Sequence, residues 1–331
     1  MSTQKKGRGL CLYSGGLDSQ LAVCVLLEQG VEVEALSFSS PFFSNDNVKN
    51  SANALGVNIH VVDFTDSILG LLKCAKHGYG SCLNPCIDCH ALMLRKAGEM
   101  MMQMGFDFVC TGEVLGQRPM SQHRQGLNMV QKDSGLGERL LRPLSALLLP
   151  ETIPEREGLV DRSRLLDLNG RNRKPQIALA KKYGIKNYPT PAGGCKLTEP
   201  NYTRRLKNLK EHEGIDDIRL LKLLNFGRHF RLPNGTLVVA GRNKADNESI
   251  RAAMRGDDVV FRSVTVPGPT VIAIQPKSEA DISIARDMCA AYADHKDISS
   301  IVIREFRPAS KPVDVIVPMI TNREIYVGMM I

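Results

Sequence analysis

The sequence has no tryptophan, and aromatic residues make up only 5% of its 331 residues. It has no apolar run long enough to span a membrane as a helix, and residues 1–8 are polar and basic, without the apolar centre of a signal peptide. It shows neither internal repeats nor low-complexity tracts. Its nine cysteines are odd in number and unevenly spaced, which argues against a secreted disulfide framework. We therefore expect a cytoplasmic protein with no membrane partner, long enough for two domains.

A glycine turn near the start is the most informative local pattern. Apolar residues 9–13 predict a strand, and residues 20–29 predict a helix that ends at Gly30. Between them stand Ser14, Gly15, Gly16, Leu17, Asp18 and Ser19, called the 14–19 turn below. Its backbone N–H groups and the helix N-terminus can approach an anion, the two serines add hydroxyl donors, and Asp18 can hold Mg²⁺. The simpler interpretation is an ordinary strand–helix turn. No G-x-x-x-x-G-K-[ST] segment is present, so a Walker-type NTPase is not supported.

Strand and helix patterns alternate through the first part of the chain. Residues 33–38, 57–62 and 106–110 predict strands, whereas 46–55, 66–76 and 87–104 predict helices. This alternation predicts an α/β domain with a parallel sheet, which we place at residues 1–225. Ligands of such sheets bind at the carboxyl ends of the strands. The 14–19 turn, Ser37, Phe38, Thr111 and Gly112 should lie at that edge.

Two further segments follow predicted strands. Residues 112–118, which include Gln117 and Arg118, should open a helix; they are either a plain connection or a second nucleotide-contacting loop. Residues 139–144 predict a short strand that breaks at Pro143, directly after Arg142.

The pattern changes near residue 226. An Asn-Gly turn at 234–235 joins two short apolar stretches and predicts a hairpin. Further strands are predicted at 258–261, 270–274, 300–305, 314–318 and 324–329, with helices at 246–254 and 279–292. We therefore predict a smaller, separate α+β domain at 226–331.

The positive charge is concentrated in the middle of the chain. The whole chain has a formal net charge of +8, and residues 111–225 alone carry 21 basic and 13 acidic side chains. A solvated surface explains any single one of these charges. A clustered excess indicates a polyanionic partner, because neutralising phosphates releases counterions. The basic runs are Arg162, Arg164, Arg171, Arg173, Lys174, Lys181, Lys182 and Lys186, followed by Arg204, Arg205, Lys207 and Lys210.

Four cysteines are candidates for chemistry. Cys86 and Cys89 follow Pro85 at a predicted helix start, where the helix dipole favours thiolates; Cys82 precedes them and Cys195 stands apart beside Gly193 and Gly194. Four interpretations remain open: a zinc site completed by Cys82 and His90, metal-free persulfide or disulfide chemistry, a radical-SAM triad, or an iron–sulfur cluster held by Cys86, Cys89 and Cys195. Cys11, Cys24, Cys110 and Cys289 lie in apolar stretches and should be core residues, and Cys74 lies in a predicted helix.

The 14–19 turn resembles the pyrophosphate loop (PP-loop) of ATP pyrophosphatases. Together with residues 84–90, the 111–118 loop and Cys195, it resembles the tRNA sulfurtransferases, most closely bacterial proteins related to 4-thiouridine synthases (ThiI-like). The resemblance covers about residues 8–225. It implies an enzyme that uses ATP and Mg²⁺ to adenylate a uridine carbonyl oxygen. It also implies a four-iron, four-sulfur cluster on Cys86, Cys89 and Cys195, with an open iron that carries sulfide. Arg142 would lie near the active site, and Arg118 could stabilise charge there with it.

Residues 239–247 and 266–269 are similar to the RNA-binding domain of NFACT-type proteins. We expect this domain to dock tRNA in place of the N-terminal THUMP domain of 4-thiouridine synthases, and few aromatics should limit base stacking. The alternative is a generic interaction module. The expected partners are tRNA and either sulfide or a sulfur donor such as a cysteine desulfurase, with a homodimer possible.

The expected product is 4-thiouridine. Other hypotheses are 2-thiouridine synthesis on the same scaffold, amidation or ligation of a small substrate, and an RNA-binding protein without catalysis.

Overall fold

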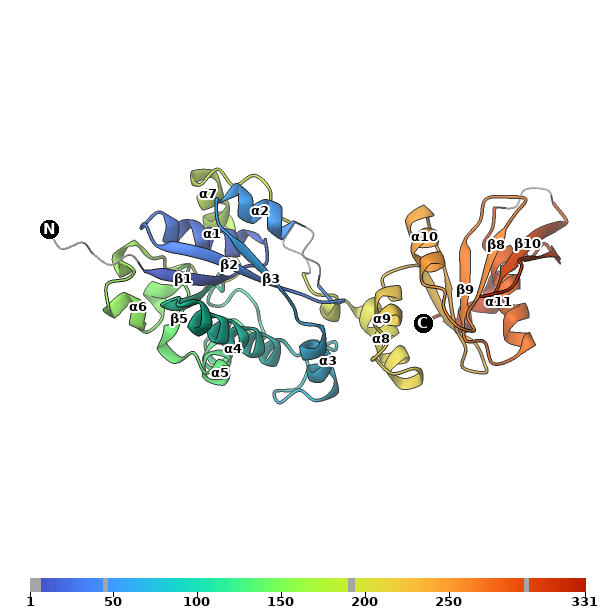
Figure 1. The fold of residues 1–331 in the computed structure, drawn as a ribbon, viewed down its shortest axis with the longest axis horizontal. Helices are drawn as coiled ribbons and strands as arrows, with labels where there is room; N and C mark the ends of the chain where they lie inside the picture. The colour runs from blue at the N-terminus through green and yellow to red at the C-terminus, as the bar shows by residue number, and fades with distance from the viewer. Residues whose placement is uncertain (1–6, 44–46, 190–193, 295–297) are drawn as a thin grey trace. The chain divides into compact units, whose positions relative to one another are not determined.

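The computed structural model describes residues 7–43, 47–189, 194–294 and 298–331 (Figure 1). The chain forms two compact units, Met1–Glu199 and Pro200–Ile331. Helices α8 (Pro200–His212) and α9 (Ile218–Leu223) belong to the second unit. The functional division at residues 225 and 226 stays a prediction. Within the described ranges, no helix combines the length and apolar character that crossing a membrane requires.

The first unit is built on a parallel five-stranded sheet. Its strands are β1 (Arg8–Leu12), β2 (Glu32–Ser39), β3 (Ile59–Asp63), β4 (Phe108–Thr111) and β5 (Leu140–Leu141). The order across the sheet is β3-β2-β1-β4-β5, and every pair is parallel. The predicted parallel-sheet α/β fold is therefore confirmed.

Helices connect these strands, as the alternating pattern predicted. They are α1 (Leu17–Leu27), α2 (Val48–Ala54), α3 (Thr65–Lys73), α4 (Cys86–Met104) and α5 (Arg124–Ser134). Two more helices follow the last strand, α6 (Ile153–Arg156) and α7 (Lys174–Lys182). Helix α1 is buried along most of its length and packs with β1, β2 and β4 into one apolar core. Cys74 lies just beyond the end of α3 in extended backbone, rather than within a helix.

The segment after β4 differs from the prediction, because residues 112–118 form a loop and the next helix begins only at Arg124. Leu115 instead forms a bridge with Asn169, and the N–H of Gly170 donates to the Leu115 carbonyl at 2.7 Å. The Gly116 N–H donates to the Gln122 carbonyl at 2.7 Å. These longer-range partners hold the backbone open where a helix would have used its own carbonyls.

The second unit contains an antiparallel six-stranded sheet in the order β11-β10-β8-β9-β7-β6. Its strands are β6 (Arg228–Arg231), β7 (Leu237–Ala240), β8 (Val259–Ser263), β9 (Thr270–Ile274), β10 (Ser300–Phe306) and β11 (Val313–Pro318). Helices α10 (Lys244–Ala252) and α11 (Glu279–Ala291) accompany it (Figure 1). The Asn-Gly hairpin is confirmed, because β6 pairs with β7.

One predicted strand of this unit is wrong. Residues Glu324–Met329 form a 3-10 helix, η5. The Tyr326 N–H donates to the Arg323 carbonyl, and the Met330 N–H donates to the Val327 carbonyl, each at 3.1 Å. These local bonds take up the backbone groups that a strand would offer to a neighbour. The β-type composition was misleading because only Tyr326 in the segment is buried.

Candidate functional site

The central strand β1 marks the point where the order of the first sheet reverses. The chain adds β2 and β3 on one side of β1, and then β4 and β5 on the other. Leu12, at the end of β1, pairs with Leu36 and Thr111. The 14–19 turn therefore emerges beside the end of β4, at the position where open α/β sheets bind their ligands.

The 14–19 turn leads directly into α1. Gly15 has a φ of +71°, a backbone conformation that favours glycine. The Gly16 N–H donates to the Ser14 hydroxyl at 3.3 Å, and the Ser19 hydroxyl donates to the Gly16 carbonyl at 2.9 Å. Ser14 is exposed, and the first N–H groups of α1 have no acceptors within their own helix. This arrangement can receive an anion.

Gly112 brings the loop after β4 against the start of α1. A Cβ atom at this position would lie 2.5 Å from the Asp18 carbonyl carbon and 2.6 Å from the Ser19 nitrogen. Both neighbours are backbone atoms, so a side-chain rotation cannot make room. Only glycine permits this approach, which confines Asp18 and Ser19 between two connections of the sheet.

A chain of amides reaches Asp18 from α7. Gln117 donates from Nε2 to Asp18 Oδ2 at 2.8 Å, and Gln176 donates from Nε2 to Gln117 Oε1 at 3.2 Å. Asp18 Oδ1 and Gln176 Oε1 are buried without a hydrogen-bond partner among the described residues. A buried carboxylate oxygen without a donor is costly, and a hard cation such as Mg²⁺ would satisfy it. The site therefore fits the predicted metal.

The predicted contacts on β2 lie at the same edge but are packed differently. Ser37 is only 2% exposed. Phe38 is also buried, and its ring centroid lies 5.1 Å from that of Phe64. Phe38 thus belongs to an apolar cluster, and its contact with a nucleotide stays a prediction.

Cys86, Cys89 and Cys195, called the three-thiol group below, are close enough to influence one another electrostatically. Burial raises the pKa of Cys89 well above its usual value, and the charges of Cys195 and Cys86 raise it further. Burial likewise raises the pKa of Cys195 to about 11, with a further contribution from Cys86. The prediction that the helix dipole would favour thiolates is therefore wrong for Cys89, because burial outweighs the dipole. Bound metal would reverse this balance, since a cation stabilises thiolates.

Neighbouring groups complete the surroundings of the three thiols. Asn84 donates from Nδ2 to Cys86 Sγ at 3.2 Å, and the charge of Arg118 acts on Cys195 to lower its pKa, against the effect of burial. The Cys82 thiol donates to the Thr198 carbonyl at 3.7 Å. Thiolates are the usual ligands of iron–sulfur clusters, and hydrogen bonds to sulfur tune such ligands, so the chemistry of these residues suits one. The glycine-flank prediction at Gly193 lies outside the described residues.

Arg142 is held inside the fold, and its predicted part in the active site stays a prediction. It is 4% exposed, and its Nε donates to Glu113 Oε2 at 2.9 Å. Its other two nitrogens donate to Gln131 Oε1 and to the Leu127 carbonyl. His90 Nδ1 lies 3.0 Å from the other oxygen of Glu113. Burial alone raises the pKa of Glu113, but the charge of Arg142 and the contacts with His90 outweigh it and hold the pKa at about 2. Arg142 therefore supports the loop after β4 from inside.

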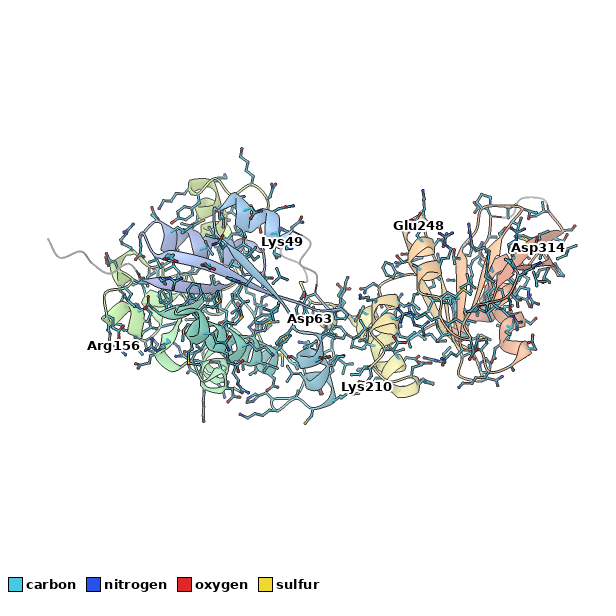
Figure 2. All side chains as sticks on the ribbon, viewed as in Figure 1. Lys49, Asp63, Arg156, Lys210, Glu248 and Asp314 are labelled. Atoms are coloured by element: carbon cyan, nitrogen blue, oxygen red, sulfur yellow. The ribbon has the colours of Figure 1, made fainter. Side chains whose placement is uncertain are left out.

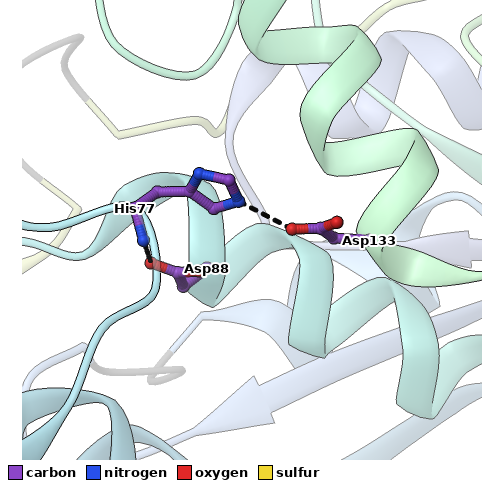
Figure 3. A group of neighbouring side chains, drawn as sticks. All are labelled: His77, Asp88 and Asp133. Carbon is purple, nitrogen blue, oxygen red and sulfur yellow. Dashed lines mark hydrogen bonds and ion pairs between the residues drawn. The ribbon is translucent and has the colours of Figure 1, made fainter.

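His77, Asp88 and Asp133 form a second group of potential ligands (Figure 3), and, besides burial, the charge of Asp88 also raises the pKa of the neighbouring Cys89. The His77 N–H donates to Asp88 Oδ2 at 2.9 Å, and His77 Nε2 lies 2.7 Å from Asp133 Oδ2. Lys76 Nζ also contacts both oxygens of Asp133 at 2.9 Å. The ammonium group of Lys76 already neutralises Asp133, so Asp133 has little need of a metal ion. The contacts instead connect the segment before α4 to α4 and α5.

Among the described residues, only some charges of the first unit's basic run have a carboxylate partner. Arg162 pairs with Glu155, and Lys182 lies 2.8 Å from Glu28. The exposed face of α7 and its flanks carries Arg171, Lys174, Lys181 and Lys186. This face could meet a polyanion, whereas the buried face of the same helix presents Gln176 to the site.

Sequence reasoning missed Gln176, Glu113 and Asn84. Gln176 is 59 residues from Gln117, and no local pattern links the two. Glu113 had a usable signal, because an acid among glycine and apolar residues directly after a buried strand is unusual. Asn84 belongs to the 84–90 segment that carries the resemblance, but that pattern does not indicate its bond to the Cys86 sulfur.

Comparison with known proteins matches the two units to different families. Residues 4–148 match the family model "Thiamine biosynthesis protein (ThiI)", and residues 227–325 match "NFACT protein RNA binding domain". A "Probable tRNA sulfurtransferase" from Caldanaerobacter subterraneus subsp. tengcongensis is 34% identical over 121 residues, 34% of this chain and 30% of that protein. One from Lysinibacillus sphaericus is 33% identical over 153 residues, 44% of this chain and 36% of that protein. The chain thus spans about a third of the length of these curated relatives.

A solved 4-thiouridine synthetase–RNA complex with bound ATP aligns with 65% of this chain and 52% of its own, at 20% identity and a TM-score of 0.36. This TM-score is too low to support any argument from the structure of that complex. The sequence matches are the stronger finding: the chain joins a region similar to the ThiI family, in its first unit, to a region similar to the NFACT RNA-binding domain, in its second.

Proposed function

We propose that this chain is an ATP-dependent tRNA sulfurtransferase that forms 4-thiouridine. The observation that carries the proposal is that two adjacent residues, Gln117 and Arg118, act on different parts of the site. Gln117 donates to Asp18 in the 14–19 turn, whereas the charge of Arg118 acts on Cys195 of the three-thiol group. An anion-binding turn and a group of thiols thus adjoin the same loop. A reaction that activates a carbonyl with ATP and then delivers sulfur needs both within reach of one base.

The first step is adenylation of the base. The phosphates of ATP bind the N–H groups at the start of α1 and the hydroxyls of Ser14 and Ser19. Asp18 would hold Mg²⁺ through Oδ1, which has no hydrogen-bond partner among the described residues, and the ion would offset phosphate charge. The O4 atom of uridine attacks the α-phosphorus as N3 loses its proton. The bond from that phosphorus to the bridging oxygen breaks, and pyrophosphate leaves. The remaining C4–O bond joins the base to AMP, a good leaving group.

The second step replaces oxygen with sulfur. A sulfur nucleophile adds at C4, the C4–O bond breaks, and AMP leaves with the oxygen. Cys86, Cys89 and Cys195 would hold a four-iron, four-sulfur cluster, which when bound would supply the sulfur. The Asn84 amide donates to the Cys86 sulfur, and the Arg118 charge offsets the negative charge of the thiolates. Sulfide would renew the sulfur directly, whereas a donor such as a cysteine desulfurase delivers persulfide sulfur and would also need a two-electron reductant such as a pair of thiols.

The test is an anaerobic thiolation assay. Cluster-reconstituted protein is mixed with unmodified tRNA, ATP, Mg²⁺ and sulfide, and the digested nucleosides are identified by mass spectrometry. We expect 4-thiouridine with the wild type and none with Cys195→Ala. Cys74→Ala is the matched control, because Cys74 is exposed and outside the three-thiol group.

Each alternative gives a distinct result. A product that co-migrates with 2-thiouridine would move the sulfur to C2 and leave the rest of the proposal intact. Pyrophosphate release without any thionucleoside, with iron bound, would indicate another nucleophile or substrate. Full activity in Cys195→Ala would overturn the assignment of the three-thiol group.

A further inference from the structure

The second unit contains a cavity of about 600 Å³ in which cationic side chains outnumber carboxylates. Six cationic side chains and two carboxylates face it, and we call it the basic cavity. The cations are Arg228, Arg242, Lys244, Arg251, Arg262 and Arg323, and the carboxylates are those of Glu248 and Asp294. Figure 2 labels Glu248 on α10. A concave, positively charged surface concentrates anions more strongly than a flat one.

The polar residues of the 239–247 segment build the walls of the cavity. Asn243 caps α10 by accepting from the Asp246 N–H at 2.9 Å. Asp246 in turn accepts from the N–H groups of Gly227 and Arg242, each at 3.1 Å. Asn247 accepts from the Thr270 N–H at 2.8 Å and so fixes the opposite wall. These side chains are occupied within the fold, which leaves the arginines to meet a ligand.

The aromatic ring in the cavity is also occupied. The guanidinium carbons of Arg228 and Arg323 each lie 5.2 Å from the centroid of the Tyr292 ring. The Arg323 Nε also donates to the Ala291 carbonyl at 2.7 Å. Cation–π contacts position the two guanidinium groups beside the ring and use the face on which a base would stack. The cavity therefore offers guanidinium forks, which match phosphate oxygens, rather than a stacking platform.

The charges of the cavity are only partly neutralised. Arg242 pairs with Asp246 at 2.7 Å, and Lys244 lies 4.0 Å from Glu248. Within the described residues, Arg228, Arg251, Arg262 and Arg323 have no carboxylate partner within ion-pair distance. Four such cations around one hollow repel one another, and an anion bound among them would relieve this repulsion.

We propose that the basic cavity binds the phosphate groups of an RNA strand, through the backbone and without reading base sequence. Its volume lies in the range of sites for small ligands, about 300–1,000 Å³, so it admits a short stretch of single strand or loop rather than a duplex. The apolar segment 266–269 faces the same space and would contact the sugars. The identity of this RNA as tRNA rests on the proposed function.

The test measures the binding of an unmodified tRNA transcript to the full chain by fluorescence anisotropy at several salt concentrations. The variant is Arg251→Gln with Arg262→Gln, because both side chains are exposed and line the cavity. We expect affinity to fall by about 10-fold or more, and the slope of log K against log salt to become shallower by about 1–2. The matched control is Arg255→Gln with Lys311→Gln, which removes two exposed cations of the same unit outside the cavity.

The outcomes separate this inference from the proposed function. Equal losses of tRNA affinity in both double variants would overturn the assignment of the cavity as the binding site, because the overall positive charge of the unit would then explain binding. Displacement of tRNA by AMP as effectively as by a short oligonucleotide would also overturn it, in favour of a mononucleotide site. If the cavity variant binds tRNA weakly but the wild type makes no thionucleoside, the inference stands and the proposed function fails. Thermal melting of each variant checks that it is folded.

Discussion

The groups of the first-unit site and those of the basic cavity are held in opposite ways. In the first unit, Glu113, Arg142 and Gln176 are buried and make specific contacts with one another or with the loop after β4. In the second unit, Arg251 and Arg262 are exposed and lack carboxylate partners among the described residues. A reaction needs groups fixed by their neighbours, whereas backbone recognition of a polyanion needs charges that water can reach before the ligand arrives.

This difference predicts where substitutions will affect folding and where they will affect only binding. In the first unit, most changes at the site should lower stability and activity together. In the basic cavity, changes should weaken binding and leave stability unchanged. Four substitutions test the contrast, beginning with the largest expected effect on stability.

Glu113→Gln should be the most destabilising. Arg142 is buried against this carboxylate, and removing one partner of a buried ion pair costs about 3–5 kcal/mol. The pKa of Glu113 is about 2 in the folded protein, below its ordinary value, so its contribution to stability is complete above that ordinary value and is lost as pH falls towards 2. Urea unfolding near neutral pH should show the full loss in the free energy of unfolding. At acidic pH, the difference in this free energy between the variant and the wild type should become smaller.

The control for this prediction is Glu99→Gln, on the exposed side of α4. It removes the same charge from the same unit and should change the free energy of unfolding by no more than about 0.5 kcal/mol. If Glu113→Gln were equally harmless near neutral pH, the ion pair with Arg142 would not hold the loop after β4.

Gly112→Ala should be next. The added methyl group would meet backbone atoms of Asp18 and Ser19 at 2.5–2.6 Å, so the loop or the start of α1 must shift. We expect a loss of about 1–3 kcal/mol in stability. Misplacement of the 14–19 turn should also slow ATP-dependent pyrophosphate release by about 10²-fold.

Gly70→Ala is the matched control, because Gly70 lies within α3 and a Cβ there has nothing within 4 Å. It should stabilise the protein by about 0.5–1 kcal/mol. Opposite signs of the two alanine substitutions in thermal melting would show that close approach, and not glycine content, matters at residue 112. Wild-type pyrophosphate release in Gly112→Ala would contradict the predicted phosphate site.

The sequence was sufficient for the fold because its signals are local. Apolar runs separated by helical patterns predicted the parallel sheet, and the Asn-Gly turn predicted the β6–β7 hairpin. The sequence-based predictions failed where a longer-range partner or local hydrogen bonds determined the backbone conformation. Leu115 pairs with Asn169 instead of entering a helix, and residues 324–329 bond within themselves instead of joining the sheet.

The candidate site was predictable only in part. The sequence identified the 14–19 turn, which is contiguous, and Cys195 was assigned through resemblance. Among its supporting residues, Gln176 was not predictable, because it reaches the site from a distant segment. Arg142 shows most clearly what a local pattern cannot predict. Its position after a strand predicted a place near the site, but nothing in the pattern indicated that its guanidinium would pair with Glu113.

Gln176→Leu should separate activity from stability. The change removes the donor that holds Gln117 against Asp18, and it also removes a buried oxygen that has no partner among the described residues. The free energy of unfolding should therefore change little. The kcat/KM for ATP, measured by pyrophosphate release, should fall by about 10-fold. Gln103→Leu, on the exposed surface of α4, is the control and should alter neither. An unchanged kcat/KM in Gln176→Leu would mean that Gln117 holds its position without help.

Arg262→Gln should have the smallest effect on stability, and that is its value to the comparison. The side chain is exposed on β8, and its charge is repelled by the other cations of the basic cavity, so its loss relieves some repulsion. The free energy of unfolding should stay within about 0.5 kcal/mol of the wild type, while tRNA binding weakens and becomes less dependent on salt. Urea unfolding and anisotropy on the same preparation check both parts. A variant that lost stability and binding together would show that Arg262 supports the fold, and the contrast between buried reaction groups and exposed binding charges would no longer hold at this position.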